Sequence, residues 1–485
     1  MHVKEEILDQ FIMPNGNNKG LSKAKITQFF NQILTFLSKA DNKPTYPNFE
    51  KFGAEHFELP DVKLSIDEIS FRVQELLDHS MNAANPKYIG HMDSIPTVWS
   101  IIGDCIASAI NNNLLSLEMS PFLTQLEYSL TKQFSSIFGL PEGAGGIMLS
   151  GGSLSNLQAL VVARNISMKS SNGDISSIGK SLVIFASSCA HSSIQKAAMI
   201  LGIGSTSVIQ VKTDQNSRMC PSDLERKIAE QKALGKVAIA VVATAGTTVT
   251  GNIDKLPEIY KITRKNQIWL HVDAIYGGAV ILSDKHKYLI EGIEHADSIA
   301  FNPQKWFYIA KTCSMVLFKD FSEMAEAFRV SAPYMKEQNS FINIGEISIQ
   351  GTKYAEVIKL WLSLLGLGKA GVGELIDFSF YISTVLISEV EKREYLKCKT
   401  DPQLNIVCFR GEPGYLPEDC FDEWNKNLQT YLIEKTNFFL SLPNYEDSLW
   451  LRAVLLNPFT TTEHVIQLFD EIDIFYNNND KELFN

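Results

Sequence analysis

Cysteine is scarce in this sequence, and its spacing forms no pattern. Seven cysteines are scattered through 485 residues without a CxxC pair, and seven is an odd number. A disulfide-stabilised domain needs paired cysteines and a zinc site needs closely spaced ligands, so neither is expected. The cysteines are Cys105, Cys189, Cys220, Cys313, Cys398, Cys408 and Cys420. This usage fits a reducing compartment, and we expect a cytoplasmic protein.

Positive charge and long apolar runs are also lacking. The formal net charge is -11 and the pI is about 5.4, with no basic run interleaved with aromatic residues, which argues against a nucleic-acid surface. The first residues, "MHVKEEILDQ", have no apolar signal core, and the apolar run "VAIAVVATA" is too short to span a bilayer. We expect a small-molecule partner, and neither nucleic acid nor membrane.

The length predicts more than one domain, because a single hydrophobic core rarely supports more than roughly 250–300 residues. Residues 1–84 are predicted to form an N-terminal helical segment. Apolar residues recur at helical spacing over 22–40, and Ser65 with Glu68 forms a capping box for a second helix. Such a segment cannot bury both apolar faces on itself. We expect it to dock on something larger, such as a second subunit.

Two α/β domains are predicted for the rest of the chain. From about residue 145, short runs that are apolar throughout alternate with helical patterns. Strands of this kind are covered on both faces, as in a mostly parallel sheet sandwiched by helices. We place a large α/β domain at residues 85–368 and a small C-terminal α/β domain at residues 369–485.

The turn "LSGGSLSN", residues 149–156, joins a predicted strand to a predicted helix. Glycines let the backbone approach a ligand, and the start of a helix favours an anion, so Gly152 and Ser153 are candidates for holding a phosphate. The alternative is a tight turn with a serine N-cap. The turn matches neither GxGxxG nor GxxxxGK[ST], and the chain has no GxSxG, which argues against dinucleotide, nucleoside-triphosphate and serine-hydrolase sites.

Three further turns carry reactive side chains. His191 precedes a helical pattern, where it can cap the helix or lay its ring on a planar ligand. His271 and Asp273 end a strand on one face, but further ligands at suitable spacing are missing, so we expect no metal and interpret Asp273 as the partner of a bound cation. Lys305 follows the strand "SIAFN" and is either solvated or an amine facing the same site.

Together, an anion cradle, a stacking ring, a carboxylate and an amine match one small molecule, pyridoxal 5'-phosphate. Its phosphate, aromatic ring, cationic ring nitrogen and aldehyde each have a partner in this set. An exposed lysine has a pKa of about 10.4 and is a poor nucleophile, so Lys305 must be desolvated or lie near a cation to react.

These motifs resemble those of the group II pyridoxal-phosphate-dependent amino acid decarboxylases, which include glutamate, aromatic amino acid and diaminobutyrate decarboxylases. The segments "GGSLSN", "AHSS", "ATAGTT", "HVDAIYGG", "HADSIAFNPQKW" and "CSMVLF" occur in the order typical of that family. The resemblance extends from about residue 85 to residue 456. It implies fold type I, a homodimer with a shared active site, and release of CO2 from an L-amino acid to form the amine.

The resemblance also implies a role for individual residues. Lys305 forms the internal aldimine, His191 stacks on the ring, and Asp273 pairs with the ring nitrogen. Further residues are implied to contact the cofactor or the substrate: Gly152, Ser153 and Asn302 at the phosphate, Thr248 near the ring, Arg452 at the substrate carboxylate, His91 and Asp93 near the substrate side chain, and Leu115 from the partner subunit. Tyr334 resembles the tyrosine of a mobile catalytic loop and is our candidate proton donor to the α-carbon.

Three positions depart from the family pattern, and they leave the substrate open. Gln304 stands where the family often has histidine, Ile275 where alanine is more common, and Lys353 at a usual arginine. His91 could recognise a carboxylate and Asp93 an amine; the alternative is that both are structural hydrogen-bonding residues. The alternatives are another reaction on the same cofactor, such as an aldehyde-forming oxidative decarboxylation, a lyase or an aminotransferase reaction, or a non-catalytic homologue that binds the cofactor.

Overall fold

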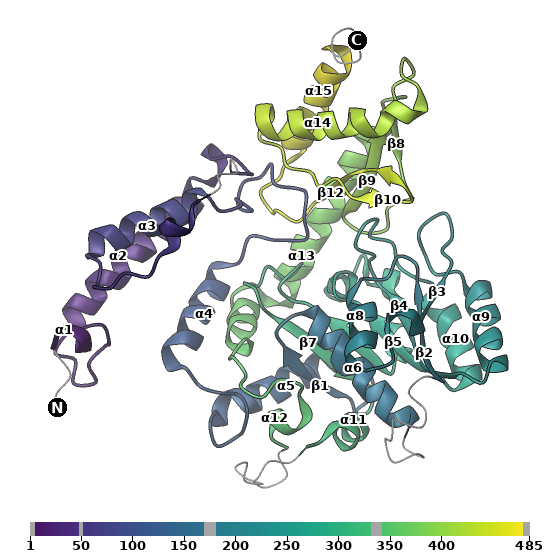
Figure 1. Ribbon diagram of the computed structural model, residues 1–485, viewed down its shortest axis with the longest axis horizontal. Coiled ribbons are helices and arrows are strands. Elements are labelled where there is room, and N and C mark those ends of the chain that lie inside the picture. The colour runs from purple at the N-terminus through teal and green to yellow at the C-terminus, as the bar shows by residue number, and fades with distance from the viewer. Residues whose placement is uncertain (1–4, 48–51, 169–180, 331–341, 479–485) are drawn as a thin grey trace.

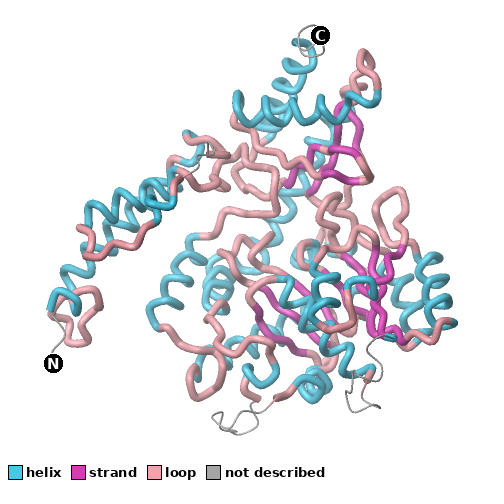
Figure 2. Tube along the Cα trace, viewed as in Figure 1, coloured by secondary structure: helices cyan, strands magenta, loops and turns pink. Residues whose placement is uncertain are grey.

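The computed structural model describes residues 5–47, 52–168, 181–330 and 342–478. A seven-stranded sheet forms the centre of the larger body (Figures 1 and 2). Its strand order is β1-β7-β6-β5-β4-β2-β3, and only β7 runs antiparallel to its neighbours. The strands are β1 Gly145–Leu149, β2 Leu182–Ser187, β3 Val208–Val211, β4 Val237–Thr244, β5 Trp269–Asp273, β6 Ser298–Phe301 and β7 Ser314–Phe318.

Helices cover this sheet on both faces, which explains why β1, β2, β6 and β7 are buried along their whole length. The predicted α/β fold with a mostly parallel, sandwiched sheet is confirmed. The helices around the sheet are α5 Pro121–Ile137, α6 Gly152–Ser167, α8 Ser193–Ile200, α9 Pro221–Ala233, α10 Leu256–Asn266, α11 Phe321–Phe328 and α12 Ile344–Ile347. Short 3₁₀ turns lie at Ala40–Asn42, Ala54–Phe57, Ser205–Ser207, Gly277–Leu282, Lys287–Ile290, Ile293–His295 and Glu418–Cys420.

A smaller unit near the C-terminus has a core of its own (Figure 1). Its antiparallel sheet has the order β12-β9-β8, and a two-stranded hairpin, β10-β11, lies beside it. Phe409, Trp424 and Phe469 are fully buried between this sheet and two helices. The elements are β8 Leu396–Cys398, β9 Ile406–Gly411, β10 Asn444–Tyr445, β11 Ser448–Leu449, β12 Leu451–Val454, α14 Phe421–Thr436 and α15 Thr462–Asn478.

The long helix α13, Val357–Glu391, connects the two bodies. Its backbone leaves the helical conformation at Gly368, where φ is 67°, a value that glycine adopts readily. By length and composition alone α13 could cross a membrane, which inspection of the sequence missed. However, residues such as Leu360 and Leu386 are completely buried in the two hydrophobic cores, so α13 is used here as a core helix.

The N-terminal segment extends away from the rest of the molecule (Figure 1). It contains α1 Glu5–Leu8, α2 Lys19–Ser38 and α3 Ile66–Asp78, and α4 Val98–Ile110 then packs along α13. The predicted capping box is confirmed, since Ser65 and Glu68 exchange hydrogen bonds at the start of α3. Neither α2 nor α3 buries any residue. The boundaries at residues 84 and 368 stay predictions.

Candidate active site

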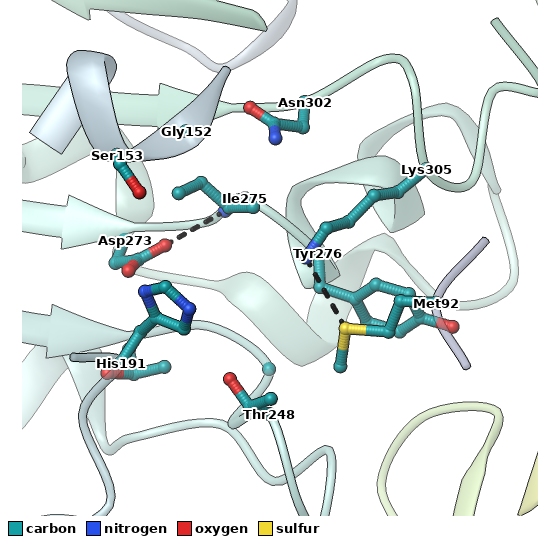
Figure 3. Close-up of a pocket in the computed structure, with 12 residues that line it drawn as sticks. Met92, Gly152, Ser153, His191, Thr248, Asp273, Ile275, Tyr276, Asn302 and Lys305 are labelled. Atoms are coloured by element: carbon teal, nitrogen blue, oxygen red, sulfur yellow. Dashed lines mark hydrogen bonds between the residues drawn. The ribbon is translucent and has the colours of Figure 1, made fainter. Parts of the chain in front are cut away.

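A cavity of about 200 Å³ lies at the carboxyl ends of β1, β4, β5 and β6, the edge where open α/β sheets bind ligands. Figure 3 shows its side chains converging from several separate turns. The residues that line it are Met92, Gly152, Ser153, His191, Thr244, Gly246, Thr248, Asp273, Ile275, Tyr276, Asn302 and Lys305. All seven residues predicted to contact a cofactor are in this set.

The turn after β1 forms an anion cradle at the start of α6. Gly151 has φ of 108° and occupies the N-cap position without a side-chain cap, so the alternative of a serine N-cap is wrong. A Cβ on Gly152 would lie 2.3 Å from Ile275 Cδ1 and 3.1 Å from Asn302 Nδ2. Asn302 Oδ1 accepts a hydrogen bond from Ser314, which turns its NH2 group toward this turn. Backbone and amide N–H groups thus surround space for a phosphate.

The amine of Lys305 lies beside Met92 and Tyr276. Its Nζ donates to Met92 Sδ at 3.4 Å, and it lies 5.7 Å from the centre of the Tyr276 ring (Figure 3). Burial lowers the pKa of Lys305, and the nearby carboxylates of Asp273 and Asp93 offset part of this effect. A lowered pKa increases the neutral, nucleophilic fraction of the amine near pH 7. Lys305 is therefore not the solvated surface lysine of the alternative interpretation.

Asp273, the last residue of β5, and His191, two residues before α8, both line the cavity (Figure 3). Asp273 is 5% exposed, and its carboxylate accepts hydrogen bonds from Asn156 Nδ2 at 2.9 Å and from the Ile275 N–H at 3.2 Å. His191 Nδ1 accepts the N–H of Ser193, the first residue of α8, at 3.1 Å. One nitrogen thus serves the helix start while the exposed ring lines the cavity, and stacking of this ring on a ligand stays a prediction. Burial lowers the pKa of His191, and Asp273 partly opposes the shift.

Five lining residues were not among the predicted cofactor contacts, although each falls inside a motif that the sequence analysis singled out or beside one of its residues. They are Met92, Thr244, Gly246, Ile275 and Tyr276. Thr244 ends β4 directly beside Asp273 on β5, and its buried Oγ1 has no hydrogen-bond partner within the described part of the chain. A buried hydroxyl without a partner at a cavity wall is expected to bind a polar group of a ligand.

Arg452 lies behind the cavity rather than in its wall. It is 7% exposed and donates to Thr248 O at 2.6 Å, Gly90 O at 3.1 Å and Ser441 Oγ at 2.9 Å, while Nη2 lies 3.2 Å from His91 Nδ1. Among the described residues no carboxylate lies within ion-pair distance of Arg452. Thr248 connects this guanidinium to the cavity.

His91 and Asp93 line a second cavity beside the first, together with Gln304 and Lys311. Asp93 forms an ion pair with Lys311 at 2.5 Å, so its charge is already compensated. Burial, the largest cause, and the charge of Arg452 lower the pKa of His91, which favours its neutral form near pH 7. The structure therefore places both residues next to the main cavity and outside its wall.

The positions of two predicted residues relative to the cavity cannot be read from a single chain's described residues. Leu115 is 8% exposed and packs against Gly345, away from the cavity; its prediction concerned the partner subunit's site and stays a prediction. Tyr334 lies outside the described residues.

The three departures from the family pattern fall in different places. Ile275 lines the cavity and packs on Gly152, as expected for a residue that crowds this face. Gln304 Oε1 accepts the N–H of Cys313 at 2.6 Å, which closes the loop after Lys305. Lys353 is 3% exposed and forms an ion pair with Glu127, itself 1% exposed, so this departure affects a buried pair and not the cavity.

Comparison with known proteins identifies the family. The family model described as "Pyridoxal-dependent decarboxylase conserved domain" matches residues 53–412. The chain belongs to this family. The decarboxylase is 32% identical to acidic amino acid decarboxylase GADL1 of Mus musculus over 434 residues, 86% of this chain and 78% of that protein. It is 33% identical to cysteine sulfinic acid decarboxylase of Homo sapiens over 354 residues, 72% of each chain.

The same fold occurs in solved structures. The crystal structure of mouse CSAD superposes with a TM-score of 0.87 at 27% identity, covering 94% of this chain and 98% of that one. The structure of Oryza sativa TDC with PLP and tryptamine has a TM-score of 0.91 at 20% identity, covering 96% of this chain and 99% of that one, and shows the likeness of fold alone.

The protein is a pyridoxal-phosphate-dependent amino acid decarboxylase, and the chemistry of its cavity fits that cofactor. The N–H groups at the start of α6 and the amide of Asn302 offer donors to a phosphate at the cavity wall, and the orphaned Thr244 hydroxyl offers a further polar contact. Asp273 and the amine of Lys305 supply the groups that a pyridinium nitrogen and an aldehyde need. Among the described residues no cluster of three or more His, Cys, Asp or Glu side chains could hold a metal ion.

Proposed function

We propose that this decarboxylase acts on an L-amino acid with a short acidic side chain, and that Lys305 holds the cofactor covalently. The observation that carries the assignment of Lys305 is its setting: in the described part of the chain the amine has only a thioether as hydrogen-bond partner, and burial lowers its pKa. Gly152, Ser153 and Asn302 hold the phosphate. His191 stacks on the ring, with Thr248 beside it.

The other residues direct the reaction. When bound, pyridoxal phosphate supplies an electron sink for the electron pair that is left as CO2 departs. Asp273 keeps the ring nitrogen protonated through a charge-assisted hydrogen bond. Arg452 lies behind Thr248, and its positive charge attracts the α-carboxylate of the substrate from behind the cavity wall. This buried guanidinium has no carboxylate partner among the described residues.

The charges near the cavity favour an acidic side chain over a basic one. Arg452 is a buried cation beside the cavity without a carboxylate partner among the described residues, whereas Asp93 and Lys311 pair with each other. A substrate amine would therefore find no free carboxylate at Asp93, whereas a second carboxylate or a sulfinate would meet a positive potential. The relatives above 30% identity, named for acidic amino acids and cysteine sulfinic acid, support the same class.

A substrate panel tests this assignment. The purified enzyme is incubated with L-aspartate, L-glutamate, L-cysteine sulfinate, L-2,4-diaminobutyrate and L-phenylalanine, and CO2 and amine are measured. We expect the acidic substrates to be preferred by at least about tenfold in kcat/KM, about 1.4 kcal/mol. Preference for diaminobutyrate or phenylalanine would overturn the substrate class. Borohydride reduction followed by peptide mapping tests Lys305 independently, since it should leave the pyridoxyl group on that residue.

We also propose Tyr334 as the proton donor to the α-carbon, on the resemblance given above. Tyr334→Phe should suppress the amine or divert the reaction to oxidative side products, while CO2 release continues. The amine and aldehyde yields are measured against CO2. An unchanged amine yield would remove Tyr334 from this role.

A homodimer with a shared active site is proposed from the N-terminal segment. Its helices α2 and α3 leave Ile26, Leu34, Phe71 and Leu76 between 50% and 67% exposed, and apolar faces of this kind are usually covered by a partner. Leu115 is 8% exposed, so only this small surface of its side chain is accessible for contact with the partner's site. Sedimentation at several concentrations tests the dimer, and a monomer at micromolar concentration would contradict it.

A cytoplasmic location is proposed from the cysteines. All seven are free thiols, as expected in a reducing compartment. Cell fractionation with an antibody to the native protein tests the proposal, and recovery in a secreted or membrane fraction would refute it.

A further inference from the structure

Asn156 is a buried amide that no role above has used. It lies on α6, one turn after Gly152, has no exposed surface and does not line the cavity. Its Nδ2 donates to Asp273 Oδ2 at 2.9 Å and to Ser193 Oγ at 2.9 Å, and its Oδ1 lies 3.0 Å from His271 Nε2. One uncharged side chain thus connects two residues of β5, His271 and Asp273, with Ser193 at the start of α8.

The direction of each hydrogen bond around Asn156 follows from its neighbours. Because the Asp273 carboxylate only accepts, the NH2 group must face it and Oδ1 must face His271. Burial lowers the pKa of His271 to about 4, so the ring is neutral at pH 7 and its one N–H lies on Nε2. His271 Nδ1 then accepts from Ser298 Oγ at 2.9 Å, and Ser298 Oγ accepts from Trp269 Nε1 at 2.8 Å. Every donor in this chain points toward Asp273.

A second branch leads from Asn156 to His191. Because Ser193 Oγ accepts one N–H of Asn156, its own hydrogen is free to point at His191 Nδ1, 2.9 Å away. The backbone N–H of Ser193 points at the same nitrogen. His191 Nδ1 is therefore an acceptor, which fixes the tautomer and the orientation of the ring.

We propose that Asn156 is a positioning residue that sets both the Asp273 carboxylate and the His191 ring for the cofactor. The inference rests on the proposed pairing of Asp273 with the cofactor's ring nitrogen. A neutral amide suits this place because it orients Asp273 without cancelling its charge; a cation would neutralise the carboxylate, and an anion would repel it.

The test compares two cofactors on cofactor-stripped protein. Dissociation constants are measured by fluorescence quenching for pyridoxal 5'-phosphate and for an analogue in which a C–H group replaces the ring nitrogen. The ratio of the two constants reports the contact between Asp273 and the ring nitrogen. In Asn156→Ala we expect this preference for the natural cofactor to fall about tenfold, as for loss of a hydrogen bond to a charged group, while affinity for the analogue changes less than about threefold.

Asn425→Ala is the matched control. Asn425 is also fully buried and also makes three hydrogen bonds, two with the backbone of Gly411 and one to Phe421 O, but it lies in the small unit. This variant should keep the wild-type preference. If Asn156→Ala weakens both cofactors equally, or keeps the preference, Asn156 has only a structural role and the inference is wrong.

A second variant covers the case in which Asn156→Ala does not fold. Asn156→Asp keeps the shape of the side chain. Relative to wild type, its preference for the natural cofactor over the analogue should fall at pH 8. The preference should recover toward pH 6, because the new carboxylate and that of Asp273 then share a proton. A preference at the wild-type level at both pH values would overturn the inference. If the wild-type protein itself shows no preference, the assignment of Asp273 fails and the inference fails with it.

Discussion

Ile275 Cδ1 occupies the space into which a side chain on Gly152 would project, 2.3 Å from the position of its Cβ. The two residues lie on different strand-end turns, at the phosphate cradle and next to Asp273. The departure from alanine at position 275 therefore makes glycine at 152 more strictly required in this chain.

Gly152→Ala is expected to weaken cofactor binding by about tenfold or more, because overpacking at a rigid turn displaces the cradle. In the double variant Gly152→Ala, Ile275→Ala we expect much of this loss to be recovered, with a coupling free energy of about 1–2 kcal/mol. The dissociation constant of pyridoxal phosphate is measured for both single variants and the double. Strictly additive effects would show that the two side chains do not compete for this space.

Replacing Lys305 should separate stability from activity. The pKa of Lys305 in the fold is lowered below its unfolded value of about 10.4. Between these two values the unfolded state binds more protons, so the stability contribution of this group rises with pH, by at most about 1.4 kcal/mol per pH unit, and is lost as pH falls. Lys305→Met should remove this slope and stabilise the cofactor-free protein at neutral pH while abolishing turnover.

Urea unfolding of cofactor-free wild type and Lys305→Met at several pH values between 7 and 10 measures the difference. Lys285→Met is a suitable control, because Lys285 has a 74% exposed side chain. An equal pH dependence in wild type and Lys305→Met would contradict the lowered pKa.

The buried pair of Lys353 and Glu127 should matter for folding and not for substrate choice. Glu127 also accepts the N–H of Met148 in β1 at 2.8 Å, so the pair ties α5 and the segment before α13 to the sheet edge. Lys353→Met should destabilise the protein by about 3–5 kcal/mol, because Glu127 would be left buried without its partner. Lys353→Arg, which restores the residue usual in the family, should keep the relative kcat/KM values of the substrate panel.

Arg452→Lys should weaken substrate use without affecting cofactor loading. A lysine keeps the charge but cannot reproduce the fork that contacts Thr248 O and Gly90 O together. We expect kcat/KM to fall by about 10²-fold, about 2.7 kcal/mol, with unchanged cofactor stoichiometry. Steady-state kinetics and the absorbance of bound cofactor measure the two effects. A loss of cofactor in this variant would instead place Arg452 among the cofactor ligands.

The sequence by itself determined the sheet, the cofactor and most of the cavity wall. Strands apolar on both faces require cover on both sides. Asp273 ends such a strand, and Gly152, Asn302 and Lys305 come within a few residues after one, so their meeting at one edge follows from the direction of parallel strands.

Only the tertiary structure decided how the remaining groups are used. Arg452 was predicted to meet the substrate carboxylate, and the fold places it behind Thr248. Lys353 was noted as a departure from the family pattern, and packing buries it against Glu127. Met92 reaches Lys305 from 213 residues away, and Asn156 meets Asp273 across 117 residues. Contacts of this separation depend on the packing of whole elements, and no local pattern in the chain encodes them.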